Sequence, residues 1–148
     1  AGDKSNSWMG SDFTFSDVEG AEVNEYTYKM LSQSDPVDGH DCWKIEATPK
    51  SNKIIKKTGY LKTINWVRKD AFLVVRGINY VKKGKRVKYY STKNVKKIDG
   101  IWTIGTIQMV TTKNKKVQHS SVFRLEDVSY NNEVDNQMFE VETMQRGL

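Results

Sequence analysis

The chain has almost no cysteine, since Cys42 is the only one among its 148 residues. A single thiol excludes an intramolecular disulfide, a cysteine-rich zinc site and an iron–sulfur cluster held by cysteines. A chain of this length buries about two-thirds of its extended surface on folding, which is enough for a hydrophobic core. We therefore expect one domain held together by packing alone.

Long apolar runs are also missing. No stretch approaches the roughly 20 residues of a transmembrane helix. The N-terminus lacks the charged and apolar regions of a signal peptide. Because the chain begins AGDKSNS without Met, we expect a processed protein or a piece of a longer one, and the missing signal pattern excludes no compartment.

Helical periodicity is nearly absent, and the chain has only two prolines. Alternation of apolar and polar residues dominates instead, with many Val, Ile, Tyr, Trp and Thr residues, as is typical of β-strands. The pattern predicts seven strands: Glu25–Ser32, Cys42–Thr48, Gly59–Val67, Phe72–Val81, Arg86–Lys97, Trp102–Thr111 and Val117–Tyr130.

Short turn signals connect these segments and predict an antiparallel meander. Asp99-Gly100 is the sharpest signal, because a type I′ hairpin turn needs two residues with positive φ. Helical turns are expected only near Ser16–Val18, with Ser16 as the N-cap, and near Asp135–Met138.

The turn lengths predict which side chains share a face of the sheet. A four-residue loop after Val67 would place Trp66 opposite Leu73. A two-residue turn at Lys83-Gly84 would place Tyr80 opposite Val87. The two registers agree only if the strand between them contains a β-bulge, which we predict at Gly77.

Further along the chain, we expect Val95 opposite Ile104 and Ile104 opposite Phe123. One face is then predicted to be apolar without interruption: Ile64, Trp66, Leu73, Val75, Ile78, Tyr80, Val87, Tyr89, Val95, Trp102, Ile104, Val110, Val117, Phe123 and Leu125. Such a face must be covered, and this chain has little helix to cover it. The sheet must curl over its own apolar side or leave part of it open for a ligand or another chain.

Basic residues exceed acidic ones, with 24 Lys and Arg against 18 Asp and Glu, and the excess lies between Lys50 and Lys116. A basic middle suits nucleic acid or anionic lipid headgroups. Three lysine doublets lie beside predicted turns, at positions 82–83, 96–97 and 115–116. This placement favours solvated turn tips and strand faces that oppose aggregation. Nucleic acid is not the expected partner, because most aromatic residues share a predicted face with aliphatic residues rather than with Lys.

The sequence contains no catalytic constellation. His40 lies in a predicted turn and His119 in the middle of a predicted strand, and nothing places them together as metal ligands. Cys42 begins a strand and is expected to be a buried, unreactive thiol. No glycine-rich phosphate loop, nucleophile elbow or carboxylate pair can be recognised. We therefore predict a protein that is not an enzyme and has no metal and no cofactor.

Five segments together resemble the C-terminal part of outer membrane lipoprotein-sorting proteins, the LolA-like family. They are SWMGSDFTFSDVEG (Ser7–Gly20), DPVDGHDCWKIEATPK (Asp35–Lys50), INWVRKDAFLVVRGINY (Ile64–Tyr80), KIDGIWTIGTIQMV (Lys97–Val110) and DNQMFEVETMQRG near the end. Their order and spacing agree across nearly the whole chain. The G-S-D-F block and the tryptophan strand followed by a turn and a second apolar strand carry most of the resemblance.

The resemblance implies a mainly β fold, in which a single curved antiparallel sheet forms a half-open, incomplete barrel with one or two short helical turns. It implies a periplasmic carrier or sorting protein of the bacterial envelope, which binds lipid acyl chains or lipoproteins on its concave apolar face. Residues 1–148 would be one such domain, without the N-terminal strands and lid helices of the family. An inner-membrane exporter of the resistance-nodulation-division type is an implied partner.

The predicted ligand-binding residues come from the apolar face and the strand beside it: Trp43, Ile45, Ile64, Trp66, Leu73, Val75, Tyr89, Trp102, Ile104 and Phe123. For each of them, ordinary core packing is the competing interpretation. The alternative function is a protein-interaction or sensor module, in which the same open sheet binds a partner or a second copy to form a homodimer.

Overall fold

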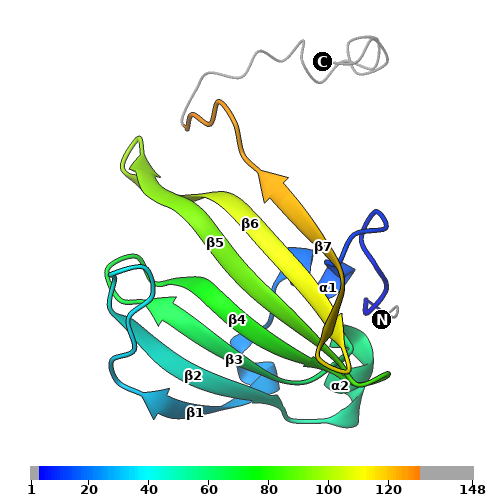
Figure 1. The fold of residues 1–148 in the computed structure, drawn as a ribbon. Helices are drawn as coiled ribbons and strands as arrows, with labels where there is room; N and C mark the ends of the chain where they lie inside the picture. Colours follow the sequence, from blue (N-terminus) through cyan, green and yellow to red (C-terminus); the bar gives the residue numbers. More distant parts are fainter. Residues whose placement is uncertain (1–3, 131–148) are drawn as a thin grey trace, which may run out of the picture.

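The structure is a computed structural model, and it describes residues 4–130. Within them, seven strands form one antiparallel sheet whose spatial order follows the chain (Figure 1). The strands are β1 (Tyr26–Ser32), β2 (Cys42–Pro49), β3 (Tyr60–Arg68), β4 (Leu73–Val81), β5 (Arg86–Ile98), β6 (Ile101–Lys113) and β7 (Lys116–Arg124). This part of the sheet is not closed into a barrel, since β1 and β7 are its two edges. The prediction of an open antiparallel meander is confirmed.

Helix α1 (Phe15–Glu19) forms where the sequence predicts a helical turn, but its N-cap differs from the prediction. Thr14, and not Ser16, caps the helix. The Thr14 hydroxyl accepts a hydrogen bond from the Asp17 amide at 3.1 Å, and the Asp17 carboxylate accepts one from the Thr14 amide at 2.7 Å. This reciprocal pair is a capping box, which satisfies two amide groups that a helix start otherwise leaves free.

Helix α2 (Asn52–Thr58) was not predicted. It ends at Gly59, whose φ of +80° closes the helix in the left-handed conformation. Seven residues are too few to show helical periodicity in the sequence. A short 3₁₀ turn, η1 (Val23–Glu25), precedes β1. The second predicted helical turn, Asp135–Met138, lies outside the described residues.

Strand β7 is shorter than predicted, since it ends at Arg124 and not at Tyr130. The Leu125 amide still donates to the Gly105 carbonyl at 2.8 Å, after which pairing stops. Asp127 has a φ of +53°, which a continuing strand does not allow.

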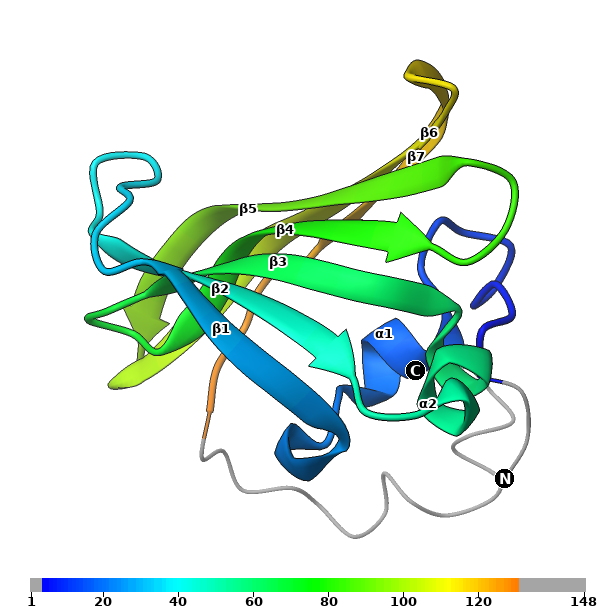
Figure 2. The same ribbon diagram turned by 90° about the horizontal axis from the view of Figure 1, so that it is seen from below.

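The sheet is strongly curved, and α1 lies inside its curve (Figure 2). The face toward α1 is the concave face, and the other is the convex face. Among the described residues, no helix combines the length and apolar character needed to cross a bilayer.

The predicted pairing of β3 with β4 is wrong. Trp66 lies opposite Arg76, and Leu73 lies opposite Arg68. The register shifts at Val75, and not at Gly77. The need for glycine at position 77 has another explanation. A Cβ atom there would lie only 3.1 Å from the Asn65 Oδ1 atom. The predicted pairs Tyr80–Val87 and Val95–Ile104 are confirmed.

The predicted pairing of β6 with β7 is also wrong. A two-residue turn at Asn114-Lys115 replaces the predicted four-residue loop, and Phe123 lies opposite Ile107 and not Ile104. Asn114 and Lys115 have φ values of +49° and +65°, which suit a tight hairpin turn. A further shift lies between Thr111 and Thr112.

These shifts place Trp66 and Phe123 on opposite faces of the sheet. Trp66 pairs with Arg76, which pairs with Ser91 on the next strand. Phe123 pairs with Ile107, which pairs with Thr92 on that same strand. Neighbouring residues in a strand point to opposite faces, so residues 91 and 92 separate the two rows. The prediction of one unbroken apolar face is therefore wrong.

Each face instead carries its own apolar cluster. On the convex face, Trp66, Val75 and the fully buried Cys42 pack with Val37 from the β1–β2 connection. Burial raises the pKa of the Cys42 thiol, as expected for an unreactive cysteine. Near α2, residues Tyr26, Ala47 and Ile54 form a second cluster. The concave face also lines the mainly apolar cavity described below.

Candidate functional site

A cavity of about 630 Å³ lies between α1 and the concave face of the sheet. This volume is within the usual range for small-molecule sites, about 300–1,000 Å³. Most of its wall is aromatic or aliphatic, and Asp17 and Arg124 are the charged residues among those that line it. Its wall includes Trp8, Phe13, Tyr60, Thr63, Tyr90, Ile107, Met109 and Phe123.

The N-terminal segment, residues 4–14, covers one end of this cavity. The rings of Trp8 and Phe13 lie against Phe123, with centroid distances of 5.1 and 4.9 Å. Both pairs are tilted, a geometry that aromatic rings favour over stacking face to face. Phe13 is buried, so the segment forms part of the cavity wall and is not a loose arm.

Asp12 anchors this segment to β6 and β7. Its carboxylate is buried and accepts hydrogen bonds from the Thr111 hydroxyl at 2.5 Å and the Ser121 hydroxyl at 2.7 Å. The Nδ1 atom of His119 also lies 2.5 Å from the carboxylate. Burial alone would raise the pKa of Asp12, but these hydrogen bonds outweigh it and lower the pKa below its ordinary value.

This cluster contains the residue types of a serine-hydrolase triad without its connectivity. In a triad, the serine hydroxyl donates to the histidine, which takes its proton. Here the Ser121 hydroxyl donates to Asp12, so His119 does not act on it. The arrangement fixes the N-terminal segment and does not activate a nucleophile. Within residues 4–130 no group of three or more His, Cys, Asp or Glu side chains is placed to hold a metal.

The polar groups of the cavity wall are mostly neutral. The Tyr60 hydroxyl donates to the Asp17 carboxylate at 2.8 Å, and burial together with this carboxylate raises the pKa of Tyr60. Burial also raises the pKa of Tyr90 to about 12. Both phenols therefore stay uncharged near neutral pH, and they offer apolar rings to a ligand.

Of the ten predicted site residues, Ile104 and Phe123 line this cavity. Trp66 and Val75 belong to the convex cluster, with Ile64 packed against it. The ring of Trp43 lies 5.9 Å from that of Phe72, and Arg68 lies over the ring of Trp102 at 4.9 Å. The remaining three residues are also outside the cavity wall: Ile45, Leu73 and Tyr89.

The structure adds cavity residues that the sequence interpretation missed. Tyr90, and not its neighbour Tyr89, points to the concave face, because Tyr90 pairs with Gly77. Met109 is 1% exposed and is also part of the wall. In β6, the large apolar residues change from even positions before Gly105 (Trp102, Ile104) to odd positions after it (Ile107, Met109), and this was a readable signal that both faces carry apolar residues.

Comparison with known families gives one match, to a family model described as an uncharacterized protein, which spans residues 1–146. No curated protein matches the chain.

Three solved structures share the fold. A DUF1329 family protein from Desulfovibrio piger aligns with a TM-score of 0.71 and 30% identity over 98% of this chain. A putative outer membrane lipoprotein-sorting protein domain from Vibrio parahaemolyticus aligns at 0.64 and 21% over 97%. A LolA superfamily protein from Nitrosomonas europaea aligns at 0.57 and 18% over 91%. This chain spans 58% of the length of each of the three. The predicted resemblance to LolA-like proteins is confirmed at the level of the fold.

Proposed function

We propose that this chain, which belongs to the uncharacterized-protein family whose model spans residues 1–146, binds lipid acyl chains in the cavity between α1 and the concave face. The observation that carries the proposal is the cavity itself, about 630 Å³ in volume and walled mainly by apolar side chains. The acyl chains belong to a free lipid or to a lipoprotein. The protein acts as a carrier and catalyses no reaction.

The binding free energy of such a carrier comes from removing acyl chains from water. Each buried methylene group contributes about 0.8 kcal/mol. The neutral phenols of Tyr60 and Tyr90 can face an acyl chain without the cost of burying a charge. Release then requires a partner or a movement of the cover, because the cavity offers no chemical step that lowers the affinity.

The solved relatives support a sorting or transport role. Two of them are titled a lipoprotein-sorting domain and a LolA superfamily protein, and we extend that role to this chain as part of the proposal. We also propose a periplasmic location. The chain spans 58% of the length of these structures, and we propose that residues 1–148 form one domain of this fold.

The two predicted protein partners stay predictions. An exporter of the resistance-nodulation-division type is implied only by the family resemblance. A homodimer that buries Trp66 and Trp102 in its interface would favour the interaction module. Trp66 is already 7% exposed within the single chain, so it offers little surface to a second copy. We therefore do not favour the protein-interaction module over the carrier.

Acyl binding can be tested with an uncharged acylglycerol that carries an environment-sensitive fluorophore. We expect the probe to bind the purified chain and its emission to rise as the fluorophore leaves water. Thr63→Trp places an indole in the cavity, where it takes up space that the acyl chain would fill. It should weaken binding at least about tenfold, because excluding two methylene groups of about 0.8 kcal/mol each costs that much affinity.

Val122→Trp is the matched control, because Val122 is exposed on the convex face in the row of Trp66. It should leave the affinity unchanged. A folded wild-type chain that neither binds the probe nor retains lipid through purification would refute the proposal.

A further inference from the structure

One end of the molecule is far more basic than the rest. Three segments meet there: α2 with Lys53, Lys56 and Lys57, the β4–β5 turn with four basic residues at 82, 83, 85 and 86, and the β6–β7 turn with three at 113, 115 and 116. The Asn114 amide donates to the Lys85 carbonyl at 3.3 Å, and the Lys82 amide donates to the Gly59 carbonyl at 2.8 Å. We call these ten residues the basic end (Figure 1).

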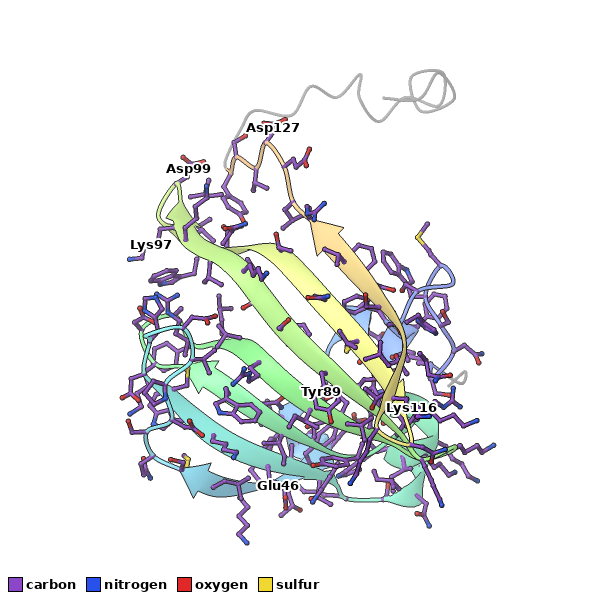
Figure 3. All side chains as sticks on the ribbon, in the orientation of Figure 1. Glu46, Tyr89, Lys97, Asp99, Lys116 and Asp127 are labelled. Atoms are coloured by element: carbon purple, nitrogen blue, oxygen red, sulfur yellow. The ribbon has the colours of Figure 1, made fainter. Side chains whose placement is uncertain are left out.

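These charges are almost unpaired. Within residues 4–130, Lys57 is the one member of the basic end that forms an ion pair, with Glu25 at 3.2 Å. Several lysines outside the basic end have carboxylate partners, such as Lys69 with Asp41 at 2.7 Å. Figure 3 shows Lys116 at the basic end, and Lys97 and Asp99 at the far end of the β5–β6 hairpin.

The basic end carries more than the whole net charge of the chain. It holds 10 of the 24 Lys and Arg residues. Among residues 4–130, the other 13 Lys and Arg face 13 Asp and Glu, so the described remainder is neutral overall. Solvated turn tips alone would need no such separation of charge, so this arrangement points to an anionic partner.

The basic end also contains a groove of about 750 Å³. Lys53, Lys56, Lys83 and Arg86 contribute to its wall, together with the apolar side chains of Ile55 and Val81. Among the described residues, no acidic side chain lines it.

A smaller polar cavity of about 270 Å³ shares wall residues with both this groove and the acyl cavity. The groove and the small cavity share Gly59 and Arg86, and the small cavity and the acyl cavity share Thr58 and Tyr60. An anionic group in the groove is therefore adjacent to the place where we propose that acyl chains bind.

We propose that the basic end docks the protein on the surface of a membrane that contains anionic phospholipids, with lipid phosphates in the groove. This orientation turns the polar cavity and the acyl cavity behind it toward the bilayer, and in that respect it rests on the proposed function. Unpaired lysines near a bilayer attract anionic headgroups, and the attraction decays within about one Debye length.

A lipid surface fits this groove better than a nucleic acid does. Single-stranded nucleic acid is usually held by aromatic side chains that stack on the bases, beside cations that contact the phosphates. Of the described residues, those lining the groove include no aromatic side chain. Its apolar members, Ile55 and Val81, suit the boundary between headgroups and acyl chains.

The test is sedimentation of the full chain with vesicles of phosphatidylcholine alone or mixed with phosphatidylglycerol. We expect binding only to the mixed vesicles, falling as salt rises. The variant Lys53→Gln/Lys56→Gln/Lys83→Gln should bind roughly tenfold more weakly or worse, because each lysine near an anionic surface contributes on its own. The control Lys29→Gln/Lys93→Gln/Lys96→Gln removes the same charge from exposed sites outside the basic end and should retain binding.

Each result decides between membrane docking and its alternatives. Equal loss in both triple variants would overturn docking through the basic end, since net charge alone would explain the binding. A single-stranded oligonucleotide that binds more tightly than the mixed vesicles, and loses affinity in the groove variant, would replace the membrane with a nucleic acid.

A competition experiment adds inorganic phosphate to the vesicle assay at constant ionic strength. If it displaces the protein from the vesicles at low concentration, the groove is a site for free phosphate and not for a membrane surface. The uncharged acylglycerol probe separates the two proposals. If both triple variants still bind the vesicles and the probe, the docking proposal is refuted and the carrier proposal stands. If the protein binds the vesicles but not the probe, the carrier proposal is refuted and the docking proposal stands.

Discussion

Asp12 shows how one side chain holds the cover of the cavity in place. Its buried carboxylate joins the N-terminal segment to Thr111 on β6 and to Ser121 and His119 on β7. We expect Asp12→Asn to lower the free energy of unfolding by about 2 kcal/mol, because hydrogen bonds to a charged group contribute about 1.5–3 kcal/mol. Urea unfolding measures this change. Glu22→Gln, at an exposed site, is the control and should change stability little.

The same substitution should reveal a dependence on pH. The pKa of Asp12 is lower in the folded state than its ordinary value, so its stabilisation is complete above that value and is lost as pH falls through the folded pKa. The difference in unfolding free energy between wild type and Asp12→Asn should therefore shrink as pH falls below about 4. A difference that grows in acid would contradict this account.

Two adjacent tyrosines provide a direct test of which face binds the ligand. Tyr90 lines the cavity, whereas Tyr89 is 44% exposed on the convex face. A carboxylate buried in an apolar site is strongly unfavourable, and it also disfavours an acyl chain beside it. We expect Tyr90→Glu to abolish binding of the acylglycerol probe and Tyr89→Glu to leave its affinity unchanged. Circular dichroism checks that both variants are folded, and Tyr90→Gln serves if the glutamate unfolds the chain.

The opposite result would restore the sequence interpretation, which placed Tyr89 in the site. That interpretation depended on which alternating positions of the strand face the ligand. A shift of the strand register by one residue exchanges the two faces. Tyr89 and Tyr90 are equally aromatic in the sequence, so their composition gives no information on which one faces the ligand.

At the scale of elements, the β6–β7 turn explains much of the difference between prediction and structure. Asn114-Lys115 adopts positive φ at both positions, although Lys has no special preference for that conformation. Lys115→Gly should therefore raise the free energy of unfolding by about 1 kcal/mol, as the strain of a side chain at positive φ is removed. Urea unfolding tests this.

The neighbouring lysine is the matched control for that turn. Lys116 begins β7, where glycine costs conformational entropy and gains nothing. Lys116→Gly should thus lower stability while removing the same charge. If Lys115→Gly also destabilises the protein, the turn does not have the conformation described here.

Local sequence patterns were sufficient to predict the strands but not their register. Six of the seven strands begin and end within two residues of the prediction, since alternation and turn residues act locally. Pairing depends on bulges such as the one at Val75, whose position is set by packing between strands and not by the strand's own sequence. Helix α2 was missed for a related reason, because its buried Ile54 packs against residues distant in sequence.

At the scale of the whole molecule, the predicted site residues are divided between two faces because both faces of the sheet carry apolar clusters. The sequence predicted one apolar face and hence one wall, which mixed Trp66 from the convex cluster with Phe123 from the cavity. A curved sheet can bury side chains on both sides, under α1 on one and under the β1–β2 connection on the other. The tertiary fold determines which face keeps a cavity. The alternation of apolar and polar residues along the strands does not predict it.

The cover and the cavity should respond together when a ligand binds. In the N-terminal segment, the Trp8 amide donates to the Phe13 carbonyl at 2.7 Å, and the rings of both residues line the cavity. A ligand that contacts these rings adds its binding free energy to the closed form, so opening of the segment should become rarer. We expect hydrogen exchange of the Trp8 amide to slow when the acylglycerol probe is bound.

The β1–β2 connection provides the reference for this measurement. The Val37 and His40 amides bond to each other's carbonyls at 2.9 and 3.0 Å, and Val37 packs on the convex face, away from the cavity. Their exchange should not change with the probe, because a convex-face turn gains no contact from it. Equal slowing at both sites would indicate a general stabilisation of the fold. No slowing at Trp8 with the probe bound would mean that the N-terminal segment does not cover the ligand, and release would then have to involve α1 and not residues 4–14.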